Sequence, residues 1–478
     1  MLWYDLETFG THPRWDRIGQ YASVRTGSDF EEIGEPTSVY CLVTPDYLPD
    51  PEACLVTGLT PKRVKGKGVP EAELADIIHR EMSVPGTCAA GYNSIRFDDE
   101  FVRNLFYRNF YDPYRREYSN GNSRWDVLDL VRMTHDLRPE GVNWEYDGEG
   151  RPQFQLERLS AANGIEHGNA HDALSDVRAT VRLARLIHGT QPKLFRFYYG
   201  LRKKDAVRRL VSLQSPRPLL HTSAMFTRAG GCTSVVYPLS AHPSQTNVII
   251  AYDLRFDPQP WLDLSVDEIR RRVFSPKDEL DPELRVHFKT IHLNRAPAVA
   301  PLATLTDDRA AALGLDVARC SSYADLLRSR GDLLAKVREV YARDAFAAPR
   351  DPELQLYSGG FFGDEDRATF ARIHSESPPQ LISSPPDFVD PRGPELLRRW
   401  LARNHFRLLP EHEQKRWLSH CASRLLAPEA DGVLDYGRFR RKVENSLART
   451  DTPAAHKPIL RDLLEYADWI ESNVLRST

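Results

Sequence analysis

Long hydrophobic runs are absent from the 478-residue sequence, and cysteine and methionine are scarce, with 6 and 4 residues. No apolar segment approaches the roughly 20 residues that a membrane-spanning helix needs. The N-terminus carries acidic residues from position 5 and lacks the basic and long apolar regions of a secretory signal peptide. These absences argue against membrane insertion and secretion, and they predict a cytoplasmic protein.

Disulfide and zinc-binding patterns are also missing. The six cysteines stand at positions 41, 54, 88, 232, 320 and 421, with no C-x-x-C pair. This scatter predicts reduced, mostly buried thiols and argues against a structural zinc site. The formal net charge of −3 argues against a generally basic protein that coats DNA. Basic runs such as 202–204 and 270–272 fit either solvated helix faces or local phosphate contacts.

The chain is long enough for several domains, and its pattern changes twice along its length. Residues 1–190 are typical of an α/β domain, residues 193–345 of a small β-rich domain with helices, and residues 350–478 of a helical domain. In the first region the expected strands are 2–5, 20–25, 38–43 and 87–91, and the expected helices are 72–82, 97–110, 125–136, 155–163 and 172–188.

The second and third regions differ in their periodicity. In the second, strands are expected at 221–227, 233–239, 247–254 and 286–293, with helices at 265–273 and 322–341. In the third, amphipathic segments at 394–409, 412–426, 436–448 and 458–475 predict a helical bundle. The proline-rich stretch 377–394 is expected to form an ordered surface connection.

The stretch "YDLETFG" (4–10) places two carboxylates at the end of the first expected strand. Asp5 and Glu7 are two residues apart, so in a strand their side chains project from the same face. Unpaired like charges in this position repel each other and cost stability. A single D-x-E is common by chance, and on its own it fits a surface pair.

Two further segments carry residue types that suit the same site. "GYNSIRFDDE" (91–100) puts Asn93 and Asp98 after an expected strand, at the edge where α/β sheets bind ligands. Asp98 fits a helix N-cap equally well. "HGNAHDALSDVRAT" (167–180) puts His171 before a helix and Asp176 on its apolar face, where a carboxylate is costly unless paired or bound to metal. On their own, these two residues also fit a packed loop histidine and a solvent-facing aspartate.

Together these segments fit one chemistry. Asp5, Glu7, Asp98 and Asp176 supply an oxygen-rich set of ligands suited to Mg²⁺ or Mn²⁺. Two such ions roughly 4 Å apart can stabilise the attacking and leaving oxygens of a phosphodiester displacement. His171 belongs to the residue type whose ordinary pKa allows it to take a proton from water near neutrality. Divalent cations would explain why Asp5 and Glu7 are tolerated side by side.

The order D-x-E, N-x-x-x-F-D, H-x-x-x-x-D over about 170 residues resembles the His-containing branch of the DEDD exonucleases. Within that branch the chain is similar to the bacterial exonuclease I family, which digests single-stranded DNA from its 3′ end. The similar segments are "ETFGTHP", "YNSIRFDDE", "FYRNFYDPY", "NSRWD", "LRPEGVNW", "ANGIEHGNAHDALSDV" and, in the C-terminal half, "LYSGGFFGDEDR". The resemblance implies an α/β RNase H-like exonuclease domain, an SH3-like β-rich domain and a C-terminal helical domain that close over single-stranded DNA.

The resemblance also implies roles for individual residues. Asp5, Glu7 and Asp176 would ligate two Mg²⁺ ions, for which Mn²⁺ would substitute, and Asp98 would bind them directly or through water. His171 would be the general base. Digestion would be processive, would release 5′-mononucleotides and would serve DNA repair or recombination. The residues expected to contact DNA are Glu7, Phe9, Asn93, Arg103, Tyr114, Arg132, Gln155 and Lys204.

One position departs from the family. Gln155 stands where its members carry arginine. Glutamine keeps a donor but lacks the charge, so phosphate affinity would be weaker or supplied elsewhere, for example by Arg158. Arg103, Tyr114, Arg132 and Lys204 fit surface ion-pair partners as well as DNA contacts.

The resemblance implies partners and leaves rival functions open. The implied partners are single-stranded DNA and the acidic C-terminal tail of single-stranded-DNA-binding protein, and the expected state is a monomer. An RNA-trimming enzyme, which uses the same chemistry, is the nearest rival function. A catalytically silent binding subunit and a polymerase proofreading subunit are rivals of other classes.

Overall fold

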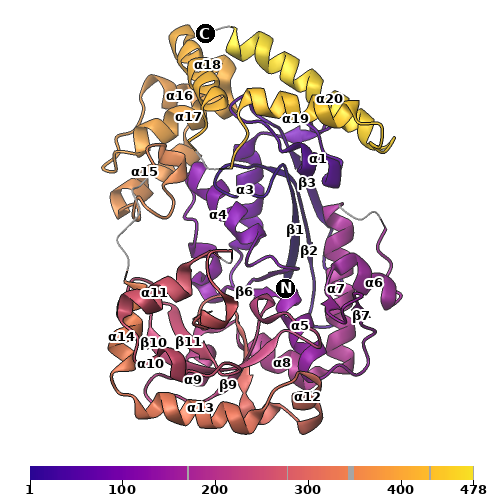
Figure 1. Cartoon of the computed structure of the whole chain (residues 1–478). Helices are drawn as coiled ribbons and strands as arrows, with labels where there is room; N and C mark the ends of the chain where they lie inside the picture. The colour runs from indigo at the N-terminus through magenta and orange to yellow at the C-terminus, as the bar shows by residue number, and fades with distance from the viewer. Residues whose placement is uncertain (169–171, 277, 343–348, 430–431, 477–478) are drawn as a thin grey trace.

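The computed structural model describes residues 1–168, 172–276, 278–342, 349–429 and 432–476 (Figure 1). It has an N-terminal α/β domain, a middle β-rich domain and a C-terminal helical domain, as the sequence predicted. The six cysteines are buried and free, which also agrees with the sequence. Within the described ranges, no helix combines the length and apolarity needed to cross a membrane.

The N-terminal domain is built on one mixed sheet with strand order β4-β3-β2-β1-β5-β6. The central strand β1 is antiparallel to β2 and parallel to β5. The apolar, β-prone residues Leu2, Trp3, Tyr4 and Leu6 make β1 suitable for a position in the middle of the sheet. The six strands are β1 (Leu2–Thr8), β2 (Ile18–Arg25), β3 (Thr37–Cys41), β4 (Gly68–Val69), β5 (Cys88–Gly91) and β6 (Ser123–Asp126).

Alternation along β1 decides which helix each side chain meets. Leu2, Tyr4 and Leu6 share a hydrophobic cluster with α3 (Glu71–Met82) and α4 (Asp98–Arg108). Trp3 belongs instead to the cluster that contains the apolar face of α7 (Ala173–Thr190). Because side chains alternate in a strand, Asp5 and Glu7 lie on the α7 side of the sheet, with Trp3.

The main helices agree with the predicted ones except at their ends. α7 continues two residues beyond the predicted end at His188 and includes Gly189. The helix ends at Thr190, and Pro192 then begins the next helix, because proline disfavours helical geometry in the residue before it. The other helices are α1 (Pro51–Thr57), α2 (Pro61–Lys65), α5 (Val127–Leu137), α6 (Leu156–Ala162), α8 (Pro192–Gly200) and α9 (Lys204–Leu210).

The middle domain is a five-stranded antiparallel sheet in the order β12-β11-β10-β9-β13. The strand expected at 221–227 is wrong in its second half, where Ser223 caps a short 3-10 helix over Ala224–Phe226. The helix expected at 322–341 is two helices, α13 (Val317–Ser329) and α14 (Leu333–Tyr341), separated around the helix-breaking Gly331. The strands are β9 (Leu219–Thr222), β10 (Thr233–Ala241), β11 (Val248–Asp253), β12 (Phe288–His292) and β13 (Ala298–Pro301), and α11 (Val266–Phe274) flanks the sheet.

The C-terminal domain is helical and lies against the N-terminal domain around α1, α3 and α4 (Figure 1). The four predicted amphipathic segments form helices, and the proline-rich stretch contains another, which begins at Pro378 with Ser377 as its cap. One further helix, α15 (Asp364–Ser375), precedes that stretch and was not among the predicted segments. The helices are α15 (Asp364–Ser375), α16 (Pro378–Ser383), α17 (Gly393–His405), α18 (Glu411–Leu426), α19 (Tyr436–Ala448) and α20 (His456–Ile470).

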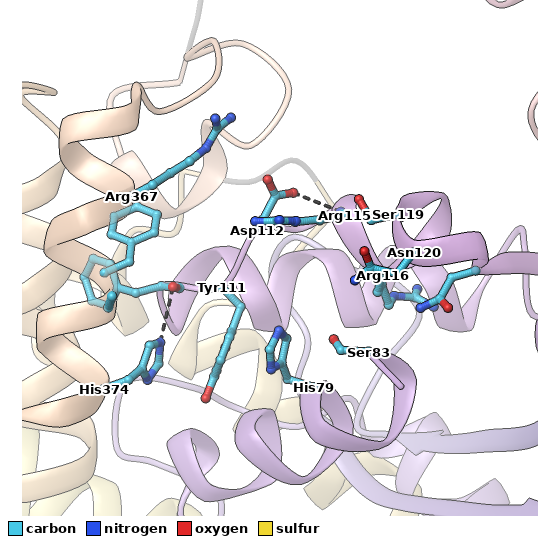
Figure 2. Close-up of a pocket in the computed structure, with 14 residues that line it drawn as sticks. His79, Ser83, Tyr111, Asp112, Arg115, Arg116, Ser119, Asn120, Arg367 and His374 are labelled. Atoms are coloured by element: carbon cyan, nitrogen blue, oxygen red, sulfur yellow. Dashed lines mark hydrogen bonds between the residues drawn. The ribbon is translucent and has the colours of Figure 1, made fainter. Parts of the chain in front are cut away.

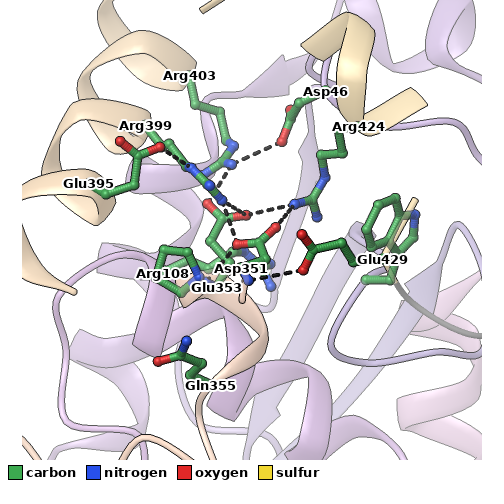
Figure 3. Close-up of polar contacts among 12 residues, drawn as sticks. Asp46, Arg108, Asp351, Glu353, Gln355, Glu395, Arg399, Arg403, Arg424 and Glu429 are labelled. Carbon is green, nitrogen blue, oxygen red and sulfur yellow. Dashed lines mark hydrogen bonds and ion pairs between the residues drawn. The ribbon is translucent and has the colours of Figure 1, made fainter. Parts of the chain in front are cut away.

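A buried network of ion pairs joins these two domains (Figure 3). Arg403 of the C-terminal domain donates to Asp46 of the N-terminal domain at 2.9 Å and to Glu353 at 2.7 Å. Arg424 and Arg399 form ion pairs with the carboxylate oxygens of Asp351, with N···O distances of 2.7 and 2.6 Å. The arginines around Asp46 and Glu353 hold the pKa of both carboxyls well below the usual range, although burial opposes this. Asp46 and Glu353 are therefore ionised, and the arginines around them compensate their charges.

Removing one acid from this network should be costly. We expect Glu353→Ala to lower the free energy of unfolding by about 3–5 kcal/mol, because Arg403 would lose a buried partner. Glu411→Ala is a matched control in the same domain, since it breaks only an exposed pair with Lys415, worth under about 1 kcal/mol. Denaturant unfolding would measure both, and equal losses would contradict a stabilising role for the buried network.

Candidate metal centre

Three carboxylates from two distant segments converge beside β1. Asp5 and Glu7 come from β1, and Asp176 comes from the first turns of α7. One oxygen from each side chain lies within 4.8 Å of the others. Such a set of hard oxygen donors suits Mg²⁺ or Mn²⁺. The structure thus brings together three of the four predicted metal ligands.

The electrostatics of this centre favour a bound cation. Burial raises the pKa of Asp5 well above its usual range, and the charges of Asp98, Glu7 and Asp176 raise it further. Burial and the charges of Asp176 and Asp172 raise the pKa of Glu7 to about 8. Acidic groups that are buried together in this way become ionised at neutral pH when a divalent cation offsets their repulsion. The residues present therefore fit a metal site.

Asp98 lies beside this set and makes a different contact. Its Oδ1 accepts a hydrogen bond from the backbone N–H of Leu6 at 3.1 Å. β5 pairs with β1 only at Leu2 and Trp3, so Asp98 supplies an acceptor further along the free edge of β1. Asp98 is 3% exposed, and its charge is the largest electrostatic influence on Asp5. Asp98 thus holds the strand segment between Asp5 and Glu7 in place.

The predicted general base, His171, lies outside the described residues. A second histidine in the same segment, His167, contacts Asp176 through its Nε2. The sequence reasoning missed His167. The signal that could have found it is the pair of histidines in "HGNAH" just before α7.

The loop after β5 is fixed by an aspartate that the sequence reasoning also missed. Asp126 accepts hydrogen bonds from the backbone N–H groups of Asn93, Ile95 and Leu128, at 3.0, 3.1 and 3.0 Å. Asn93 has a positive φ of 63°, which asparagine tolerates better than most residues. The predicted site residue Asn93 is therefore held at the end of β5 by a neighbouring strand.

Two predicted DNA contacts are buried in this structure. Arg103 is 4% exposed and is paired with Glu117 at 2.7 Å and Glu100 at 2.6 Å. Phe9 is 0% exposed and packs in the hydrophobic cluster that includes Tyr47 and much of the C-terminal domain. Both side chains are held by contacts within the protein, and their roles toward DNA stay predictions.

Tyr114 lies in an aromatic cluster at the junction with the C-terminal domain. Its ring centroid is 6.5 Å from that of Tyr357 and 5.8 Å from that of Phe361. Tyr357 is 48% exposed and Phe361 is 81% exposed. Exposed aromatic rings of this kind can stack on bases. The sequence reasoning missed these two residues, although "LYSGGFF" contains both.

The remaining predicted contacts are dispersed. Arg132 is held by Asp129 at 2.9 Å, and Asp129 also binds Arg96 through two hydrogen bonds of 3.1 and 2.9 Å. Gln155 is exposed at the N-terminus of α6, without a capping bond from its side chain. Lys204 begins α9 and donates to Asn247 of the middle domain.

A separate cavity of about 390 Å³ lies at the junction of α3 and α15 (Figure 2). His79, Tyr111 and His374 stack along it, with ring centroids 4.3 and 4.1 Å apart. Among the predicted site residues that the structure describes, none lines it. Because α3 covers the opposite face of the sheet from Asp5 and Glu7, this cavity is not part of the metal centre.

Three family models match the sequence in order. They are described as Exonuclease over residues 2–184, Exonuclease I SH3-like domain over 202–343 and Exonuclease I C-terminal domain over 350–470. The chain belongs to the exonuclease I family. Exodeoxyribonuclease I of Escherichia coli K12 is 43% identical over 420 residues, which cover 88% of each chain. The enzyme of the same name from Haemophilus influenzae is 43% identical over 425 residues, 88% of this chain and 90% of that one.

Solved structures of the family match the whole fold. Exonuclease I from Methylocaldum szegediense is 43% identical, with a TM-score of 0.92 over 98% of this chain and 99% of that one. E. coli exonuclease I in complex with a dA16 oligonucleotide is 40% identical, with a TM-score of 0.93 over the same shares. These likenesses confirm the predicted family and the predicted order of exonuclease, SH3-like and helical domains.

The raised pKa of Glu7 predicts how metal and pH act on stability. The ordinary glutamate pKa is 4.5, and in the folded chain it is about 8. Between these values the folded, metal-free protein keeps a proton that the unfolded chain releases, so stability falls as pH rises from about 5 to 8. A divalent cation would bind the ionised form, so we expect Mg²⁺ to stabilise the protein more at about pH 8 than at about pH 6.

Thermal unfolding with EDTA or with Mg²⁺, across this pH range, would measure both effects. Glu7→Gln is the matched control, because it keeps the shape of the side chain and removes the titrating group. We expect its metal-free stability to fall less steeply with pH. Identical pH profiles for the two proteins would contradict the assignment.

Proposed function

We propose that the protein is a metal-dependent exonuclease that removes nucleotides from the 3′ end of single-stranded DNA. The observation that carries the proposal is the convergence of Asp5, Glu7 and Asp176 within 4.8 Å, in a chain of the exonuclease I family. The E. coli relative has been crystallised with single-stranded DNA in zinc-bound and metal-free forms, which supports both the substrate and a role for divalent metal.

The proposed roles of the four carboxylates differ with their positions. Asp5, Glu7 and Asp176 would hold two divalent ions, with Mg²⁺ as the expected metal and Mn²⁺ as a substitute. When bound, such ions supply charge stabilisation to the attacking and leaving oxygens of the scissile phosphodiester. Asp98 keeps β1 in register through Leu6 and adds negative potential beside Asp5. His171, as general base, would take the proton of the attacking water.

The strand itself would be held by rings and by dispersed cations. Tyr114, Tyr357 and Phe361 offer partly exposed rings on which successive bases can stack. Stacking of this kind tolerates any sequence, as a degradative enzyme requires. Arg132 and Lys204 are the proposed phosphate contacts, and Asn93 and Gln155 are the proposed contacts near the terminal nucleotide.

Family membership supports several further parts of the proposal. Digestion would be processive and would release 5′-mononucleotides, in DNA repair or recombination in the cytoplasm. The protein would act as a monomer, because its three domains can flank the strand without a second copy. A binding site for the acidic tail of single-stranded-DNA-binding protein completes the proposal.

A time course on a 5′-labelled single-stranded DNA oligonucleotide tests the central activity. We expect stepwise shortening from the 3′ end with Mg²⁺, none with EDTA, and little loss from the duplex or the RNA of the same sequence. Shortened RNA would favour an RNA-trimming enzyme. Intact DNA under all conditions, together with tight binding, would favour a silent binding subunit.

Removal of a single metal ligand should separate cleavage from binding. We expect Asp5→Ala or Asp176→Ala to lower the cleavage rate by at least about 10³-fold, because charge stabilisation at the phosphodiester is usually the largest contribution to catalysis. Affinity for single-stranded DNA should change little, since the proposed base and phosphate contacts lie elsewhere. His171→Ala should lower the turnover rate more than the affinity. Fluorescence anisotropy would measure binding, and loss of binding and cleavage together would show that these carboxylates are structural.

A further inference from the structure

We propose that Gln20 and Asp172 are positioning residues that hold Asp176 in register with Asp5 and Glu7. The inference rests on the proposed function, because it concerns how the metal ligands of that function are brought together. Asp5 and Glu7 belong to β1, whereas Asp176 lies about 170 residues later in α7. Three carboxylates that repel each other need a link between these elements that does not depend on the metal.

Gln20 is placed to make that link from the strand side. It lies in β2 directly opposite Glu7 in the antiparallel ladder, and it is buried, at 2% exposed. Side chains of cross-strand partners project from the same face, so Gln20 points toward α7 as Glu7 does. The ladder shifts register immediately beyond this pair, where Gly19 is left without a partner in β1.

The bulge at Gly19 fixes where Gln20 stands. A Cβ atom at position 19 would approach the side chain of Leu59 to 2.9 Å and the ring of Phe9 to 3.1 Å, so only glycine fits without displacement. β-Bulges often redirect a side chain next to a functional site. Here the bulge ends the regular pairing of β1 and β2 one residue after Glu7.

Asp172 completes the link from the helix side. The Nε2 of Gln20 donates to Asp172 Oδ1 at 3.0 Å and to Ser38 Oγ at 3.2 Å. The backbone carbonyl of Asp172 in turn accepts from the N–H of Asp176 at 3.1 Å. Asp172 therefore accepts a hydrogen bond from Gln20 through its side chain and one from Asp176 through its backbone carbonyl.

Two features indicate that this contact serves the site. Asp172 occupies the N-cap position of α7, yet its side chain makes no capping bond and turns to Gln20 instead. The partner is also a neutral amide, although a cation would pair with Asp172 more strongly. A lysine or arginine at position 20 would lie opposite Glu7 and compete with a divalent ion for the same carboxylates.

A double-mutant cycle tests the proposal. Gln20→Met removes the donor at similar size, and Asp172→Ala removes the acceptor. We expect each to lower the turnover rate by on the order of 10- to 100-fold and to raise the half-saturating Mg²⁺ concentration, with KM for single-stranded DNA little changed. The double variant should be no worse than either single variant, because both break one contact.

Two controls separate positioning from other roles. Asp172→Asn keeps an acceptor oxygen and should restore most of the rate that Asp172→Ala loses. Ser38→Ala removes the other partner of Gln20, which is exposed on β3, and should leave the rate and the Mg²⁺ midpoint close to those of the unmodified protein. The melting temperature in EDTA, measured for each variant, identifies any general loss of folding.

The outcomes distinguish failure of the proposed function from failure of the positioning role. An unmodified protein without Mg²⁺-dependent cleavage would overturn the proposed function itself. An active unmodified protein, with Gln20→Met unchanged or with additive losses in the double variant, would overturn only the positioning role. A loss in Asp172→Asn as large as that in Asp172→Ala, with Gln20→Met unaffected, would make Asp172 a metal ligand and would also overturn it.

Discussion

Mutual repulsion among buried carboxylates is the constraint on which the rest of this structure depends. Asp5, Glu7 and Asp176 lie within 4.8 Å of one another, and burial raises the pKa of the first two. A fold that only needed stability would not keep such a group together. The sheet and α7 hold the three carboxylates in place against their mutual repulsion. A divalent cation would neutralise their charge.

The N-terminal and C-terminal domains contribute to that rigidity at different distances from the site. β2 pairs with β1 on one side along Asp5 and Glu7, whereas β5 pairs with β1 on the other side only at Leu2 and Trp3. Asp98 extends the support along the free edge by accepting the backbone N–H of Leu6. Further away, the ion-pair network around Arg403 and Glu353 fixes the C-terminal domain on the N-terminal one. Tyr357 and Phe361, whose rings are exposed, lie at the same junction. The C-terminal domain therefore both packs on the N-terminal domain and presents the proposed stacking surface.

Much of the fold could be predicted because its signals are local. Alternation in "YDLETFG" predicts a strand with two carboxylates on one face, and the periodicity of 172–188 predicts α7 to within two residues. The errors fall where local signals are weak or compete. The strand expected at 221–227 ended early because Ser223 caps a turn, and the helix expected at 322–341 broke where glycine follows Arg330.

The sequence by itself determined which carboxylates are candidate metal ligands, their order and the succession of three domains, because these depend on residue type and short-range period. Only the tertiary structure decided which candidates are accessible. Phe9 lies in a hydrophobic cluster with residues of the C-terminal domain, and Arg103 contacts Tyr357 as well as its nearer partner Glu117. It also decided that Asp98 bonds to the backbone of Leu6 and that Gln20 reaches Asp172. Such contacts depend on the three-dimensional path of the chain, which no local pattern encodes.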